Sequence, residues 1–378
     1  SALPEEAFDT MHAGQIANLD PSAMSVFTAD NIAALSPDIY MSFSADHIEN
    51  LQPETFASFS DMGVGRLDPD ALSALDASML AAMPNDTLSG FQSYQIQNLS
   101  DDILGELSGE QFAALNPSAI SELTAEQVSA LSPDIFSGDG IQQFEHLSSD
   151  ALPGLSPEAV ASIPAHAVDT LFTSEFMEVI DADVIGALTA DQVGNLSSEV
   201  IQTMDASTVG AIAPESMSQL GNNVMDIQPD AFAGMTADHI SALPEEAFDT
   251  MHAGQIANLD PSAMSVFTAD NIAALSPDIY MSFSADHIEN LQPETFASFS
   301  DMGVGRLDPD ALSALDASML AAMPNDTLSG FQSYQIQNLS DDILGELSGE
   351  QFAALNPSAI YELTAEQVSA LSPDIFSG

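Results

Sequence analysis

The chain has 378 residues, of which 58 are Asp or Glu and only two are Lys or Arg, so its formal net charge is −56 at pH 7. Nucleic acids and anionic membranes are bound through Lys and Arg side chains that neutralise phosphate groups, so this composition excludes both as partners. No cysteine is present, which excludes disulfides and thiolate metal sites. No apolar run approaches the roughly 18 residues of a transmembrane helix.

A large repeat covers the whole chain. Residues 1–138 recur at 241–378, and the single difference is Ser121, which becomes Tyr361. The chain therefore holds a first large repeat at residues 1–240 and a partial second copy at 241–378. Such near-identity is typical of giant surface and fibre proteins whose function lies in their length. We expect the natural protein to be longer and to contain further copies.

A much shorter repeat lies within the large one. From Leu3 to Leu171 an apolar residue returns at every eighth position, with one lapse at Asp139. A nine-residue step from Leu171 to Ile180 and a seven-residue step from Leu220 to Ile227 cancel each other, so we place register slips at 172–180 and 221–227. The 240-residue repeat thus divides into thirty octads.

Each octad has the pattern of a helix start, as in residues 35–42, Leu-Ser-Pro-Asp-Ile-Tyr-Met-Ser. The Ser, Thr or Asp at position two predicts an N-terminal cap, as at Thr28, Ser36 and Asp68. Proline at position three suits the first helical residue, and an acid at position four faces the positive end of the helix dipole. The apolar residues at position six and at position one of the next octad then share one face of a short helix.

One octad buries too little apolar surface to be stable alone, so the octads must stack on one another. At position six, bulky residues alternate with β-branched ones, as in Phe8, Ile16, Met24 and Ile32. This alternation favours two facing rows of helices. The sequence therefore predicts an all-α solenoid, or superhelix, of very short helices, with one helix per octad and two octads per coil.

Several octads resemble known repeats. Those at 51–58, 131–138 and 155–162 resemble the short helical repeats of the mesothelin, stereocilin and otoancorin family. Those at 123–130 and 188–195 resemble the Leu-Thr-x-x-Gln-Val-x-Ala repeats of giant bacterial surface proteins. The resemblance implies an extracellular superhelix used in adhesion or matrix attachment.

Three acids are candidate calcium ligands: Asp139, which lies in a Gly-Asp-Gly sequence, and the pair Asp181 and Asp183. The Gly-Asp-Gly sequence can equally be a hinge or a break in the solenoid. The segment 172–183 and the seven-residue step at 221–226 can each be a local bulge or a docking surface for another protomer. The position-four acids predict diffuse or weak binding of cations such as calcium, although helix-dipole complementation explains each of them singly. No other cofactor is predicted.

The remaining polar residues give no catalytic pattern. The histidines lack the close pairing of a zinc site, no acid-His-Ser set can be assigned, and no glycine-rich phosphate loop is present. Arg66 is expected to relieve repulsion among Asp61, Asp68 and Asp70, or to pair with another chain. Asn-x-Ser/Thr sequons that either carry glycans in a secreting eukaryote or occur by chance begin at Asn85, Asn98 and Asn195.

These observations predict a structural protein and no enzyme. We expect the shaft of an extracellular or cell-surface filament, whose partners are cations and copies of itself that meet end to end or laterally. The alternative is a calcium-dependent adhesin or matrix-binding scaffold.

Overall fold

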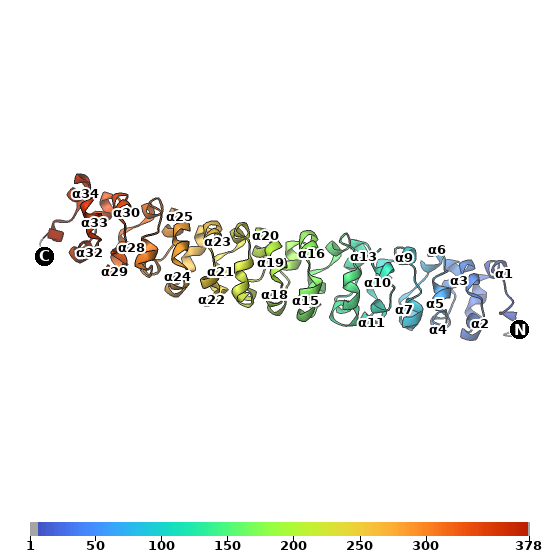
Figure 1. Ribbon diagram of the computed structural model, residues 1–378. Helices are drawn as coiled ribbons and strands as arrows, with labels where there is room; N and C mark the ends of the chain where they lie inside the picture. Colours follow the sequence, from blue (N-terminus) through green and yellow to red (C-terminus); the bar gives the residue numbers. More distant parts are fainter. Residues whose placement is uncertain (1–6, 377–378) are drawn as a thin grey trace. The chain divides into compact units, whose positions relative to one another are not determined.

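A computed structural model describes residues 7–376 as a succession of short α-helices and 3-10 helices, with no β-strand in that range (Figure 1). The chain forms two compact units, residues 1–187 and 188–378. This confirms an all-helical repeat. No described helix has the length and apolarity needed to cross a membrane.

The elements of the first unit follow the octads of residues 11–187. They are α1 (Ala13–Ala17), η2 (Pro21–Val26), α2 (Ala29–Ala33), η3 (Pro37–Ser42), α3 (Ala45–Glu49), α4 (Pro53–Phe56), α5 (Asp61–Val64), α6 (Pro69–Leu72), α7 (Ala77–Ala82), α8 (Asn85–Leu88), α9 (Ser93–Ile96), α10 (Asp101–Gly105), α11 (Gly109–Ala113), α12 (Pro117–Ile120), α13 (Ala125–Ala130), η4 (Pro133–Ser137), η5 (Asp139–His146), η6 (Leu152–Gly154), α14 (Pro157–Ser162), α15 (Ala165–Leu171), α16 (Ser174–Val179) and α17 (Ala182–Ile185).

The second unit continues in the same way. Its elements are α18 (Ala190–Gly194), α19 (Ser198–Thr203), α20 (Ala206–Ala211), η7 (Pro214–Gln219), η8 (Gly221–Asp226), η9 (Pro229–Gly234), α21 (Ala237–Ala242), α22 (Glu245–Thr250), α23 (Ala253–Asn258), η10 (Pro261–Val266), α24 (Ala269–Ala274), η11 (Pro277–Ser282), α25 (Ala285–Glu289), α26 (Pro293–Phe296), α27 (Asp301–Val304), η12 (Ala311–Ala314), α28 (Ala317–Ala322), α29 (Asn325–Leu328), α30 (Ser333–Gln337), α31 (Asp341–Gly345), α32 (Gly349–Ala354), α33 (Pro357–Tyr361), α34 (Ala365–Ala370) and η13 (Pro373–Phe376).

The core contains the predicted octad positions. Most position-one and position-six side chains are buried, including Leu35, Phe43, Ile48 and Leu51. Position-four acids such as Glu54 are exposed. Each helix ends in a hydrogen bond to the octad that follows it. The position-one N–H of that octad donates to the position-six carbonyl before it, as from Leu51 to Ile48 at 3.0 Å. The predicted division between core and surface is confirmed.

The caps agree with the sequence except before some prolines. The side chain of Thr28 accepts from the N–H of Asn31, and that of Asp68 accepts from the N–H of Asp70. The side chain of Ser36, however, makes no cap bond, so this prediction is wrong. The element that follows Ser36 is a 3-10 helix, and its tighter first turn already uses the N–H of Ile39, which donates to the Ser36 carbonyl at 2.9 Å and so does not reach the Ser36 hydroxyl.

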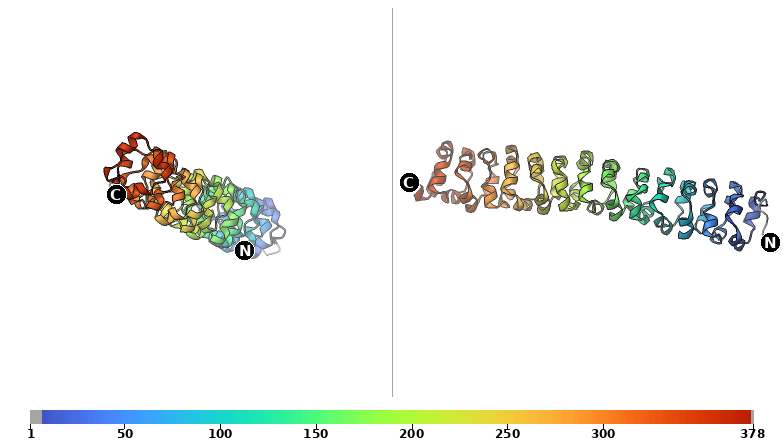
Figure 2. Two further views of the ribbon diagram at one scale, coloured as in Figure 1. Left: turned by 60° about the vertical axis from the view of Figure 1, so that its left-hand side comes forward. Right: turned by 90° about the horizontal axis from the view of Figure 1, so that it is seen from below.

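Octads that pack against each other are three octads apart. Helix α3 contacts η2 and α6, and α23 contacts η9 and η11 in the second unit. Figures 1 and 2 show how the short helices follow one another along each unit. The prediction of two octads per coil is therefore wrong. A coil of two octads would bring together octads 16 residues apart, whereas these contacts join octads 24 residues apart.

Both register slips are absorbed within the helical pattern. Phe172 is 1% exposed and takes the core position, while Leu171 is only partly buried, so the extra residue lies within α15 and one octad earlier than predicted. At the seven-residue step, Leu220 and Ile227 both stay buried. Gly221 makes this possible, because its φ of 50° is in the left-handed region that glycine adopts without strain.

The lapse at Asp139 leaves the chain helical. Elements η4 and η5 follow each other directly, and η5 packs against α11, four octads earlier, as well as against α12, three octads earlier. Gly140 is buried at this point, and a Cβ on it would lie 2.4 Å from the Ile135 carbonyl oxygen. The glycine is therefore needed for the close approach of the two elements.

Candidate functional site

The three candidate calcium ligands do not form one site. Asp139 begins η5, Asp181 is the N-cap of α17 and Asp183 lies in the first turn of α17, and all three side chains are exposed. Between residues 7 and 376, no three Asp, Glu or His side chains converge in a group that could hold a metal ion. Calcium binding at these residues stays a prediction.

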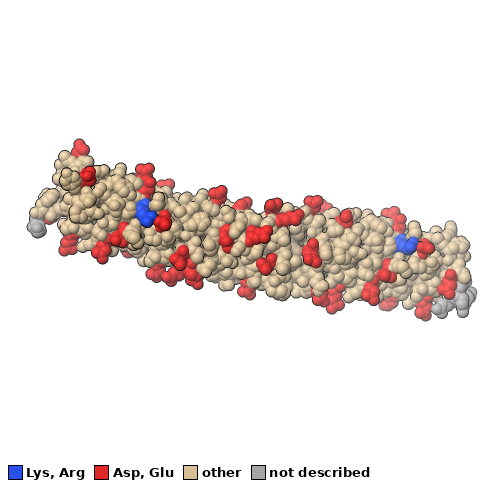
Figure 3. Space-filling model, viewed as in Figure 1, with Lys and Arg blue, Asp and Glu red and all other residues tan. Residues whose placement is uncertain are grey.

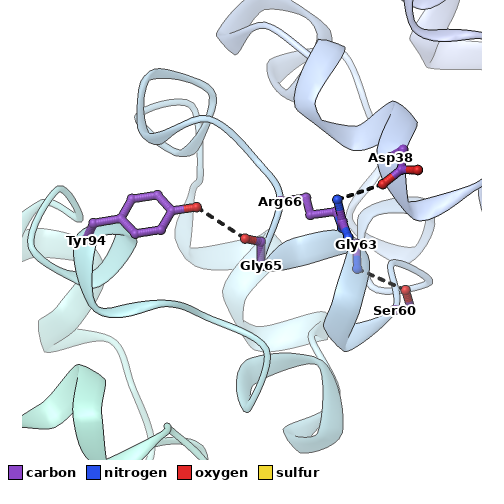
Figure 4. A network of polar contacts seen from close by, with 6 residues as sticks. All are labelled: Asp38, Ser60, Gly63, Gly65, Arg66 and Tyr94. Carbon is purple, nitrogen blue, oxygen red and sulfur yellow. Dashed lines mark hydrogen bonds and ion pairs between the residues drawn. The ribbon is translucent and has the colours of Figure 1, made fainter.

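Arg66 forms an ion pair that the sequence did not indicate. Its Nη1 lies 2.6 Å from Asp38 Oδ1, on the octad three before its own, and relief of repulsion among Asp61, Asp68 and Asp70 stays a prediction (Figure 4). The second copy repeats the contact between Arg306 and Asp278. In Figure 3 each blue arginine lies beside a red carboxylate. Both partners are exposed, so the pair stabilises the fold by less than about 1 kcal/mol.

A shallow hollow beside Arg66 is lined by Asp61, Met62, Gln92 and Tyr94. The Tyr94 hydroxyl crosses it and donates to the Gly65 carbonyl at 3.3 Å (Figure 4). The hollow marks a place where backbones approach closely, since a Cβ on Gly90 would lie 2.1 Å from the Asp61 carbonyl oxygen. The same hollow recurs around Arg306 in the second copy. Pairing of Arg66 with another chain stays a prediction.

The structure places another set of polar side chains inside the core, all at position five of an octad. Sequence reasoning gave this position no role. Every buried polar side chain among the described residues occupies it: His47, Thr55, Thr87, Gln95, Gln111, Gln127, Gln143, Gln192, Ser216, His239, Gln255, His287, Thr295, Thr327, Gln335 and Gln367.

Gln95 shows what a position-five side chain does. Its Nε2 donates to the carbonyls of Val64 and Leu67, both at 2.8 Å, which belong to the octads four and three before its own. Its Oε1 accepts from the N–H of Gln92, at position two of its own octad, at 2.8 Å. One amide group therefore caps its own helix and bonds it to the octads before it. Because these bonds are buried, losing the side chain would leave the Leu67 carbonyl without its donor, while the Val64 carbonyl would keep the N–H of Leu67 at 3.1 Å.

Other residue types at position five make part or all of this connection. The Thr87 hydroxyl donates to the Phe59 carbonyl at 2.9 Å. His47 makes both bonds, because its Nδ1 accepts from the N–H of Ser44 at 3.1 Å and its Nε2 lies 3.1 Å from the Leu19 carbonyl oxygen. A buried ring that accepts at Nδ1 and donates at Nε2 is the neutral imidazole.

A sequence signal for this position exists. Ser or Thr at position two followed three residues later by Gln is the capping-box pattern, as in Thr124 and Gln127 or Ser108 and Gln111. The pattern predicts the bond to the side chain's own helix. It contains nothing about the second bond, because the carbonyls that accept it lie 28 and 31 residues earlier in the chain, as for Gln95.

The three sequon asparagines are exposed. Two of them already use the side-chain nitrogen: Asn98 Nδ2 donates to the Tyr94 carbonyl at 2.6 Å, and Asn195 Nδ2 donates to the Asp191 carbonyl at 2.7 Å. Asn85 begins helix α8. The two asparagines at position eight therefore hydrogen-bond carbonyls at the ends of their own helices. Glycosylation stays a prediction.

No protein-family model and no curated protein matches this chain. The resemblance to the mesothelin and bacterial surface repeats therefore stays a prediction based on the octads alone.

Proposed function

We propose that the octads form an α-solenoid with three octads per turn, and that this solenoid is the structural shaft of an extracellular or cell-surface filament without catalytic activity. The observation that supports this most is the contact pattern. In each unit the elements pack on those three octads before and after, and buried position-five side chains connect them.

Such contacts are local along the chain, so nothing in the pattern closes the structure on itself. Turns can be added without changing those already present, which is how repeat proteins gain length. The exposed acids give the surface a high negative charge, which keeps shafts soluble and apart unless cations screen them. We therefore propose end-to-end or cation-assisted contacts between copies of the chain.

The length of chains with one, two and three 240-residue repeats tests this function. Thirty octads divided by three give ten turns, and helices stack about 8 to 10 Å apart, so each repeat should add roughly 80 to 100 Å. Small-angle X-ray scattering and electron microscopy would measure the step. Compact particles that barely lengthen would contradict the shaft, and a step of roughly 120 to 150 Å would mean two octads per turn.

The same samples should be measured after removal of divalent cations with a chelator. A passive shaft keeps its length. A large loss of helix or length on chelation would favour the calcium-dependent adhesin instead.

A further inference from the structure

Large apolar side chains are exposed at the same places in both copies of the large repeat, on the octads around the two arginines. Met62 is 63% exposed and Tyr94 is 48% exposed, and both line the hollow beside Arg66. Met41 is exposed as well. It lies three residues after Asp38 in η3, so the two side chains are on the same side of that 3-10 helix. The counterparts in the second copy are exposed to nearly the same extent: Met281, Met302 and Tyr334.

This combination of residues differs from the rest of the surface. The chain has 58 acids and only two cations, so the surface repels another copy almost everywhere. Arginine, tyrosine and methionine are enriched where proteins meet, whereas acids and lysine are depleted there. We define the arginine patch as Asp38, Met41, Asp61, Met62, Arg66 and Tyr94, and the same patch recurs around Arg306.

We propose that the arginine patch is the lateral contact between two copies of the chain, in which each patch binds the same patch of the second copy about a two-fold axis. This inference rests on the proposed shaft and names the surface through which two shafts associate side by side. In a two-fold contact every pair of residues forms twice, because each copy supplies both members.

Charge complementarity identifies a second copy as the occupant. Arg66 contacts Asp38 through Nη1, but a guanidinium has five N–H donors in a planar fork and can bind a second carboxylate at the same time (Figure 4). Asp61 is exposed and lines the same hollow. Arg66 of one copy therefore binds Asp61 of the other, and the reverse pair forms with it. Met62 and Tyr94 of the two copies then cover one another.

A single patch gives only a weak contact, because a stable interface contains about 20 to 30 residues on each partner and the patch is smaller. Repetition compensates for this weakness. Once two chains meet at one patch, a further patch binds at a high effective concentration wherever the geometry allows both contacts. Association therefore strengthens as large repeats are added.

Sedimentation equilibrium of the full chain tests the proposal, in about 0.15 M sodium chloride, which screens charges farther apart than about 8 Å. R66E combined with R306E places glutamate opposite Asp61, and D61K combined with D301K places lysine opposite Arg66. Each variant should raise the dissociation constant at least about tenfold, because like charges then face each other across the contact. An equimolar mixture of the two variants should associate as the unsubstituted chain does, because each glutamate then meets a lysine.

Glu54→Lys combined with Glu294→Lys is the matched control, since it changes the net charge by the same amount as D61K with D301K. Glu54 is exposed and lies in α4, which packs against α2 and α7, and neither of these helices lines the hollow. This control should associate at least as strongly as the unsubstituted chain. Circular dichroism checks that every variant is folded.

Four results would overturn the proposal. The unsubstituted chain stays monomeric at the highest concentration measured, or the charge-reversed variants associate without change, as contacts through the ends of the stack would. Alternatively, the mixture associates as weakly as its components, or the Glu54 control loses as much as D61K with D301K. None of these results bears on the shaft itself, because scattering measures the length of the single particle separately.

Discussion

Residues 109–136 and 349–376 have the same sequence apart from Ser121 and Tyr361, yet their cores differ. Phe136 is fully buried, whereas its counterpart Phe376 is 66% exposed, and Val128 is 2% exposed where Val368 is 45% exposed. In the first copy η5 packs on α11 and η6 packs on α13. Residues 139–154, which form these two elements, occur once in the 378-residue sequence. An octad therefore receives part of its core from the octads that follow it.

Near the starts of the two copies, burial depends instead on the octads that come before. Gln255 is fully buried and bonds the carbonyls of Val224 and Ile227. Its counterpart Gln15 is exposed, and within residues 7–376 its side chain makes only the bond that caps its own helix, in which its Oε1 accepts from the N–H of His12 at 3.0 Å. An octad thus makes the hydrogen bonds of its own helix by itself, but its core side chains are buried only by other octads. What it lacks comes from three octads before and three octads after.

The largest expected effect is the difference in unfolding free energy lost when Phe136 or Phe376 is replaced by alanine. Phe136→Ala removes a fully buried ring and should cost about 3 to 5 kcal/mol of unfolding free energy. Phe376→Ala removes the same ring from an exposed position and should cost less than about 0.5 kcal/mol. Urea unfolding followed by circular dichroism measures both. Equal losses in the two variants would mean that neighbouring octads do not decide the burial of the side chain.

A smaller effect is expected for the two glutamines. Gln255→Ala leaves the buried carbonyl of Ile227 without a donor, while the Val224 carbonyl keeps the N–H of Ile227, and one unsatisfied group costs about 1 to 3 kcal/mol. Gln15→Ala removes only an exposed cap bond, so a cost below about 1 kcal/mol is expected. The same urea experiment compares them. A cost at Gln15 as large as that at Gln255 would show that the helix cap, and not the bond between octads, carries the energy.

The division between local and distant contacts also decides what the sequence could predict. Helix starts, core positions and the exposed acids depend on residues within one octad, so the octad pattern predicts them correctly. Which octads pack against each other depends on contacts between residues distant in the chain, and the alternation at position six contains no information about those contacts. Likewise the partner of Arg66 is Asp38, which lies 28 residues earlier, and not one of the acids that are near in sequence.

Two further errors have local causes. Leu171 and Phe172 are adjacent and both apolar, so the sequence could not choose which of them enters the core. Ser36 and Thr28 look equally suitable as caps, and only the 3-10 geometry after Ser36 distinguishes them. The capping-box pattern would have identified position five as a helix cap, but its second bond needs the stacked structure.

The smallest effect concerns a contact that lies within one octad and should therefore be the same in both copies. The Oδ1 atoms of Asp76 and Asp316 each accept from a backbone N–H, that of Met79 or Met319, at 2.8 Å. Each also accepts from a serine hydroxyl two residues on at 2.6 Å. Asp76→Ala and Asp316→Ala should each cost about 1 kcal/mol in the urea experiment, with no difference between them.

The pH dependence of these caps gives an independent check. In both residues the hydrogen bond from the serine side chain, followed by that from the backbone N–H, lowers the carboxyl pKa. The cap contribution is therefore fully present above the ordinary Asp pKa of about 3.9 and is lost as pH falls through the lower pKa of the folded state. Asp76→Asn and Asp316→Asn keep a cap that does not titrate, so the stability lost below pH 4 should shrink by the same amount in both variants. A clear difference between the two copies here would mean that even a bond inside one octad depends on its place in the stack.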